Sequence, residues 1–202
     1  EYERYIGLEE RYSEIRFPYM IIGVGVSGSG KSRFTEEMVR ELGGVRIRSD
    51  VERKRLYGFA PQADSRQEGV DIYTQDATER TYRHLARISG ILFEAGPSVC
   101  IDATCLKQAQ RSLLADQAEA RGLAVMIISF EADEATLRSR IEKRARLGGD
   151  PSEASLSVLE RQLEHFEPFS EEERRHLVHL DTTAKNASET LAELIHQHMN
   201  QL

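Results

Sequence analysis

The chain has 202 residues, 40% of them hydrophobic, which suits one α/β domain with a sizeable core. Its formal net charge of -7 argues against a general nucleic-acid binder, because clustered lysine and arginine bind the phosphate backbone. The spacing of Cys100 and Cys105 is not CxxC, so we expect reduced thiols rather than a disulfide framework or zinc site. A membrane-spanning helix needs about 18 consecutive apolar residues, and the sequence has no such run. We therefore expect a cytoplasmic protein that does not enter a membrane.

Residues 1–18 are mixed and polar, and Pro18 ends them. We expect this segment to be an N-terminal arm or linker, followed by a single domain at residues 19–202. The chain begins at Glu1 without a methionine, which leaves room for an attached or upstream domain.

An almost wholly apolar run at residues 19–24 predicts a strand buried on both faces. A glycine-rich turn follows and leads into a helix that ends at the glycine pair 43–44. Residues 45–48 are expected to form a second strand. Ser49, with Glu52 three positions later, has the pattern of a capping box, so we expect a helix to begin there.

The remaining elements alternate in the same way after a glycine- and proline-containing loop at residues 58–70. In chain order we expect a helix at 74–95, a strand at 98–102, a helix at 107–121, a strand at 124–130, helices at 133–147 and 155–166, a strand at 176–180 and a helix at 187–199. Strands that alternate with helices predict a parallel sheet covered on both faces.

The strongest motif is GVSGSGKS at residues 25–32, which has the P-loop pattern G-x-x-x-x-G-K-[ST] between an apolar strand and a helix. Its backbone N–H groups can face phosphate oxygens, and the helix N-terminus adds a positive dipole end. Lys31 is expected to reach the β- and γ-phosphates of ATP, and the Ser32 hydroxyl to ligate Mg²⁺. The nucleotide-binding residues would be Gly25, Ser27, Gly28, Ser29, Gly30, Lys31, Ser32 and Arg33.

Beyond the P-loop, four more segments support a resemblance: RSDVERKRL at 48–56, IDAT at 101–104, residues 137–146 and residues 150–168. With these segments the chain resembles the "predicted kinase" branch of P-loop proteins, which is similar to polynucleotide 5′-hydroxyl kinases, gluconate kinases and zeta toxins. The match looks closest to the ATP-binding half of bacterial two-part proteins whose other half looks like an aminoglycoside phosphotransferase. The resemblance implies a P-loop NTPase three-layer fold: a five-stranded parallel sheet, helices on both faces and a helical lid.

Asp50 lies just past the second strand, where ligands gather in such sheets. In the kinases that this chain resembles, an aspartate here contacts the acceptor hydroxyl and acts as general base. Its negative charge would also complement the dipole of the helix that it begins. Arg53, on the same face, is expected either to bind an anionic acceptor or to pair with Asp50.

Asp102 ends the third expected strand, where a carboxylate can hold the Mg²⁺ shell. Thr104 completes the Asp-Ala-Thr pattern and is expected to touch the acceptor or a phosphate. The alternative for both residues is a polar strand end with satisfied turn contacts.

Several arginines crowd the end of the 133–147 helix, and Arg140 and Arg144 share one face. By resemblance, the region at about 138–155 is a lid that closes over ATP and places these two arginines on the transferring phosphate. A solvated charged face is the alternative. Gln162 lies in the following helix, and comparable helices in gluconate-kinase-like proteins lie near the nucleotide or acceptor. Because it stands beside the Leu159 and Leu163 stripe, we expect it to be a surface residue instead.

Together these features predict a kinase that transfers the γ-phosphoryl group of Mg-ATP to a hydroxyl of a small-molecule acceptor. Lys31, Asp50, Arg140 and Arg144 would be catalytic, Asp50, Arg53 and Thr104 would bind the acceptor, and Ser32 and Asp102 would hold the metal. Three alternatives stay open: a polynucleotide 5′-hydroxyl kinase, a zeta-toxin-like kinase of nucleotide sugars, and an ATP-binding regulatory module of a larger protein.

Overall fold

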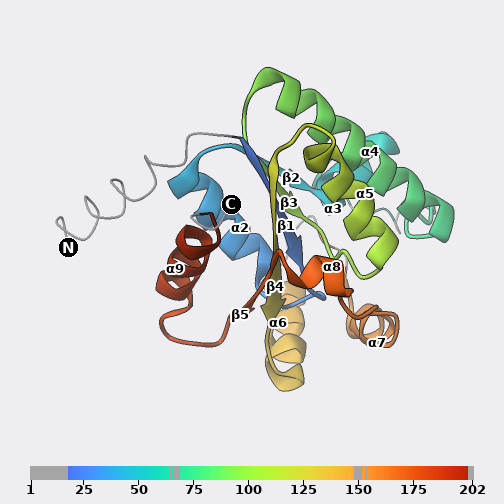
Figure 1. The fold of residues 1–202 in the computed structure, drawn as a ribbon. Helices are drawn as coiled ribbons and strands as arrows, with labels where there is room; N and C mark the ends of the chain where they lie inside the picture. Colours follow the sequence, from blue (N-terminus) through green and yellow to red (C-terminus); the bar gives the residue numbers. More distant parts are fainter. Residues whose placement is uncertain (1–17, 64, 66–68, 148–151, 153, 200–202) are drawn as a thin grey trace.

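The computed structural model describes residues 18–63, 65, 69–147, 152 and 154–199, and its centre is a five-stranded sheet (Figure 1). The strands lie in the order β2-β3-β1-β4-β5, and every neighbouring pair is parallel. Their bounds are β1 Tyr19–Val24, β2 Val45–Arg48, β3 Val99–Asp102, β4 Ala124–Glu131 and β5 Leu177–Asp181. The predicted five-stranded parallel sheet is confirmed.

Helices connect the strands and also follow the last one. Their bounds are α2 Lys31–Leu42, α3 Ser49–Leu56, α4 Gln75–Ala95, α5 Gln108–Glu119, α6 Glu134–Leu147, α7 Leu156–Glu164, α8 Glu171–Arg174 and α9 Ala187–Met199. Among the residues described, no helix is both long enough and apolar enough to cross a membrane.

Two apolar clusters form the core, one on each face of the sheet. Alternate β1 side chains such as Met20 and Ile22 pack with residues of α4 and α5, including Leu85. The intervening Ile21 packs with α2 and α9, including Phe34. All six residues of β1 are buried, as an apolar central strand requires. Figure 1 shows the resulting three layers, with α2 and α9 on one face and α4 and α5 on the other.

The predicted bounds need small corrections, and one start signal was wrong. Ser49 is the first residue of α3 rather than its cap, and Arg48 occupies the cap position without a side-chain bond. Glu52 instead accepts a hydrogen bond from Arg55 (2.6 Å), three positions later in the same helix. Its carboxylate therefore bonds to a side chain of α3 and does not form the predicted capping box. The short helix α8 was not predicted; Ser170 and Glu173 form a capping box there.

Two other predicted segments fall partly or wholly outside the described residues. The expected arm is described only at Pro18, and the expected lid is described through Leu147, at residue 152 and from residue 154 onward. The start of the lid region is thus the second half of α6, and its end leads into α7.

The strand register brings the expected site residues to one edge of the sheet. Asp102 is aligned with Gly23 of β1 on one side and with Arg48 of β2 on the other. The P-loop leaves the adjacent end of β1, and α3 starts directly after β2. The carboxyl edge of the sheet therefore gathers the P-loop, Asp50 and Asp102, as expected for a ligand site in this architecture.

Candidate active site

The turn at residues 25–30 is fixed by backbone contacts within itself and to the loop after β3. The N–H of Gly25 donates to the Thr104 carbonyl (3.1 Å), and the N–H of Ser29 donates to the Val26 carbonyl (3.2 Å). The first contact ties the P-loop to the loop after β3, so the two segments keep a set spacing.

Helix α6 packs directly against the top of this turn. Gly28 has a φ of 84°, and a Cβ added to it would lie 2.7 Å from the Leu137 carbonyl oxygen. Only glycine fits at this approach. The N–H groups of Lys31 and Ser32, in the first turn of α2, have no acceptor four residues back within the helix. The turn and the start of α2 therefore form the kind of donor set that binds a phosphate anion.

Lys31 points back into the turn. Its Nζ donates to the Val26 carbonyl (3.2 Å), and the residue is buried. Burial lowers the pKa of Lys31, and the negative charges of Asp102 and Asp50 oppose that shift. The ammonium group thus sits inside the loop with two carboxylates nearby.

Asp50 lies in the first turn of α3 and is partly buried. Burial raises the pKa of Asp50, the charge of Asp102 raises it further, and Lys31, Arg53 and Arg48 lower it. A carboxylate with a raised pKa accepts a proton more readily than an ordinary aspartate. The expected location of Asp50 beside Lys31 agrees with this electrostatic environment.

Asp102 is almost completely buried and forms two ion pairs through Oδ2. Arg46 of β2 lies 2.6 Å away, and Arg48 lies 3.4 Å away. This pairing was not predicted, because the two arginines lie on a strand that is distant from Asp102 in sequence. Asp102 therefore presents a carboxylate that is already partly neutralised.

The residues expected to bind magnesium supply only part of the oxygen ligands that this ion needs. Across the part of the chain that the structure describes, no group of three or more His, Cys, Asp or Glu side chains is arranged to hold a metal. Mg²⁺ seldom needs such a cage, because it keeps waters and binds one or two protein oxygens together with substrate phosphates. Ser32, beside Lys31 at the start of α2, and Asp102 supply oxygens of that kind.

Arg53 is held by hydrogen bonds to the protein interior. One guanidinium nitrogen donates to the Ile72 carbonyl (2.8 Å) and to Thr78 (3.2 Å), and the group lies 5.0 Å from the Tyr73 ring centroid. Its Nε atom is buried without a hydrogen-bond partner. Arg53 therefore links α3 to the segment before α4 and still retains one donor.

Thr104 and Cys105 lie in the loop after β3, against a buried tyrosine. The Tyr82 hydroxyl accepts from the Cys105 N–H (2.9 Å) and lies 3.4 Å from the Thr104 hydroxyl. Burial raises the pKa of Cys105 to about 12, so its thiol stays protonated at neutral pH. Cys105 is thus a packed residue, and Thr104 lies where the P-loop meets this loop.

A buried arginine fixes the other end of the same loop. Arg111 of α5 is fully buried and donates to the carbonyls of Cys105 (3.1 Å) and Leu106 (3.2 Å). It also donates to the Pro168 carbonyl (3.2 Å) and pairs with Glu173 of α8. Arg111 therefore joins the loop after β3 to the chain that follows α7. It was not predicted, because nothing in the neighbouring sequence marks it as buried.

The two expected lid arginines occupy different places. Arg140 donates to the Gly28 carbonyl (3.1 Å), to the Thr182 hydroxyl (2.9 Å) and to the Thr182 carbonyl (3.1 Å). Arg144 is close enough to Lys31 for its charge to lower the pKa of Lys31. Arg140 is thus bonded to the P-loop backbone and to Thr182, whereas Arg144 donates to the Ala154 carbonyl (3.5 Å), in the chain just before α7.

Gln162 contacts the P-loop, and Arg33 lies on the surface beside it. Gln162, expected on the surface, accepts a hydrogen bond from the Ser27 N–H of the P-loop (2.7 Å). The prediction was wrong because a contact across 135 positions leaves no trace in helix periodicity. Arg33 is exposed, and its guanidinium lies 5.1 Å from the Phe34 ring centroid.

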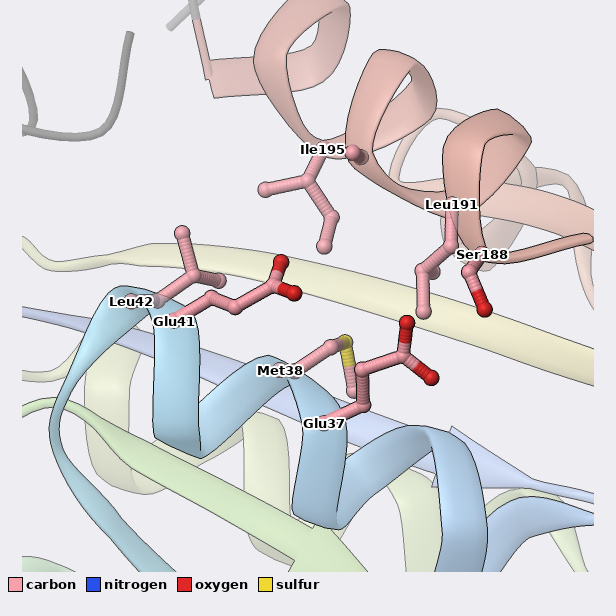
Figure 2. Close-up of a pocket in the computed structure, with 8 residues that line it drawn as sticks. Glu37, Met38, Glu41, Leu42, Ser188, Leu191 and Ile195 are labelled. Carbon is pink, nitrogen blue, oxygen red and sulfur yellow. The ribbon is translucent and has the colours of Figure 1, made fainter. Parts of the chain in front are cut away.

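Figure 2 shows a pocket that is separate from this site. It lies between the C-terminal half of α2 and α9, with Met38, Leu191 and Ile195 among its lining and Glu37 and Glu41 at its side. Its volume of about 10 Å³ admits no more than a water molecule. Because the P-loop precedes the opposite end of α2, this pocket has no part in the candidate site.

Solved structures similar to this chain share its fold. A gluconokinase from Sinorhizobium meliloti matches with a TM-score of 0.61 and 23% identity, over 92% of this chain and 94% of that one. A sugar kinase from a Janibacter species matches with a TM-score of 0.65 and 22% identity, over 91% and 95%. An APS kinase from Mycobacterium tuberculosis, in complex with AMPPNP and APS, matches with a TM-score of 0.61 and 16% identity, over 91% and 98%.

At these identities the likeness establishes the P-loop kinase fold alone. No curated protein matches the sequence. A family model described as "AAA domain" matches residues 20–169, which include the P-loop, both aspartates, the arginines of α6 and Gln162. Since that match spans well over half of the chain, the protein belongs to this AAA-domain family.

Proposed function

We propose that this protein is an ATP-dependent phosphotransferase that moves the γ-phosphoryl group of ATP to a hydroxyl of a small-molecule acceptor. The observation that carries the proposal is the grouping of Lys31 with Asp50 and Asp102 beside the P-loop, at the carboxyl edge of a parallel sheet. A carboxylate whose pKa is raised next to the phosphate lysine suits proton transfer from an acceptor hydroxyl, which supports transfer chemistry over nucleotide binding alone.

In the proposed reaction, Asp50 accepts the proton of the acceptor hydroxyl. The acceptor oxygen then bonds to the γ-phosphorus while the bond from that phosphorus to the β,γ-bridging oxygen breaks, and ADP leaves. Lys31 and Arg144 stabilise the negative charge on the transferring group. Bound Mg²⁺ would neutralise charge on the phosphates, with Ser32 and Asp102 as its protein oxygens.

Arg53 and Thr104 are the proposed acceptor contacts beside Asp50. The unpaired, buried Nε of Arg53 and the charge of Arg48 near Asp50 favour an acceptor that carries a negative group. Arg140 and the P-loop residues from Gly25 to Arg33 are assigned to the nucleotide. The domain would span residues 19–202 with its lid at about 138–155. Its two free, buried cysteines agree with the reducing cytoplasm expected for it.

The test is ADP release from Mg-ATP with a panel of hydroxyl acceptors. Sugars and gluconate head the panel because two similar structures are a gluconokinase and a sugar kinase. Nucleotide sugars, aminoglycosides and 5′-hydroxyl oligonucleotides complete it. We expect one class to stimulate turnover, and Asp50→Asn to lower kcat about 10²–10⁴-fold without changing ATP affinity.

The matched control is Asp116→Asn, which makes the same change at an exposed position of α5 and should behave as wild type. Tight ATP binding without turnover for any acceptor, and with no effect of Asp50→Asn, would contradict a phosphotransferase. It would favour an ATP-binding module that serves an attached domain, such as the aminoglycoside-phosphotransferase-like partner predicted from the sequence.

A further inference from the structure

The contact between Gln162 and the P-loop defines the orientation of an amide group. The Ser27 N–H can only donate, so the atom 2.7 Å from it must be the amide oxygen Oε1. The Nε2 group therefore points away from this N–H, with two hydrogens to donate. Within the described part of the chain, Nε2 has no hydrogen-bond partner.

Helix α7 holds Gln162 in this position by packing. Leu159, one turn earlier on the same helix, is fully buried and belongs to a cluster with Val26, Leu137 and Ile141. That cluster joins the P-loop, α6 and α7. The side chain of Gln162 therefore reaches the loop from a helix whose place is set by apolar contacts.

The peptide group that Gln162 touches is also the one that Lys31 touches. Its carbonyl belongs to Val26 and accepts from the Lys31 Nζ (3.2 Å), while its N–H belongs to Ser27 and donates to Gln162. Lys31 is the residue that reaches the β- and γ-phosphates in P-loop proteins. Because this peptide is trans, Lys31 and Gln162 approach it from opposite sides, and together they fix one peptide group of the P-loop.

Building on the function proposed above, we propose that Gln162 is a further catalytic residue that donates a hydrogen bond from Nε2 to the terminal phosphoryl group. The Ser27 N–H holds Oε1 and so orients the amide before the nucleotide arrives. The donated bond is charge-assisted, because its acceptor is a phosphate oxygen. ADP lacks the terminal group and cannot receive it.

Two substitutions separate this role from a merely structural one. Gln162→Glu keeps an oxygen that accepts from Ser27 but replaces the donor with a charged oxygen that repels phosphate. Gln162→Ala removes both contacts. A donor to the terminal phosphate predicts that Gln162→Glu is the more harmful change, whereas a simple tether of α7 to the P-loop predicts the reverse.

The experiment measures AMPPNP and ADP affinities by calorimetry with Mg²⁺, alongside kcat. We expect Gln162→Glu to weaken AMPPNP binding at least about tenfold and Gln162→Ala by a smaller factor, with ADP affinity within about twofold of wild type in both. Gln197→Glu, at an exposed position of α9, controls for the added charge.

The outcomes distinguish this inference from the proposed function. Wild-type AMPPNP affinity in Gln162→Glu, or a loss that ADP shares equally, would overturn the donor role while leaving the kinase proposal intact. A wild-type protein that binds neither nucleotide would overturn both.

Discussion

The two sides of the P-loop are built differently. On the β2–α3 side, Asp102 is buried and paired with arginines of β2, and Arg53 is buried and bonded to the Ile72 carbonyl before α4. On the α6–α7 side, Arg140 and Gln162 reach the P-loop through the ends of their side chains and contact its backbone. The first side is thus set by the fold, and the second depends on how two helices lie over the loop. In the proposed reaction, the first side would prepare the acceptor and the second would close over the nucleotide.

Arg111 is where the two sides meet, and its removal should produce the largest effect. Arg111→Met leaves the buried Glu173 carboxylate without its partner, so we expect a loss of about 3–5 kcal/mol in the free energy of unfolding. Urea or thermal unfolding measures it, and the melting temperature should fall by about 10 °C.

An exposed ion pair supplies the control for that experiment. Arg83→Met breaks the pair with Glu79 on the surface of α4, where the side chains are 69% and 52% exposed. Its cost should stay below about 0.5 kcal/mol. Similar losses of stability for the two variants would mean that the buried contact of Arg111 with Glu173 contributes no more than a surface ion pair.

The two lid arginines offer a sharper test within the α6–α7 side. Arg144→Ala should lower kcat about 10²-fold, because Arg144 is proposed to stabilise the transferring phosphate and its charge acts on Lys31. Arg140→Ala should chiefly weaken ATP binding, about tenfold, because its guanidinium is bonded to the Gly28 carbonyl and to Thr182. Steady-state kinetics with varied ATP separates kcat from KM. Equal effects of the two substitutions on kcat would contradict the different roles assigned to Arg140 and Arg144.

The smallest expected effect lies on the β2–α3 side and concerns pH. Since burial and Asp102 raise the pKa of Asp50, the folded protein favours its protonated form. Ionisation of Asp50 therefore costs stability as pH rises through the pKa of the folded state. Asp50→Asn should be more stable than wild type by about 1 kcal/mol at pH 7. The gain should vanish below the ordinary aspartate pKa of 3.8.

Thermal unfolding of both proteins from pH 3 to pH 8 checks this linkage. The same variant loses activity in the proposed mechanism, so greater stability at neutral pH would mark Asp50 as a residue kept for chemistry. A variant that is less stable than wild type at pH 7 would indicate that the positive charges of Lys31, Arg53 and Arg48 outweigh the cost of burying Asp50.

What the sequence could predict follows the same division. Local patterns and strand order can both be predicted from the sequence. They are enough to predict the P-loop, the parallel sheet and the location of Asp50 and Asp102 at its edge. Gln162 and Arg111 were missed because their roles come from contacts across 135 and 62 positions. Arg46 was missed for a similar reason, since its partner Asp102 lies 56 positions later, on the next strand of the chain.

The contacts of Arg111 also limit which segments of this protein can be exchanged with those of a related protein. An engineered chimera that takes residues 156–174 from another kinase would import a new α7 and α8 while leaving Arg111 behind in α5. Unless the insert supplied an acid at the position of Glu173, a fully buried guanidinium would lose its only carboxylate partner among the described residues. The exchangeable unit on the lid side is therefore larger than the lid itself, and it includes α5.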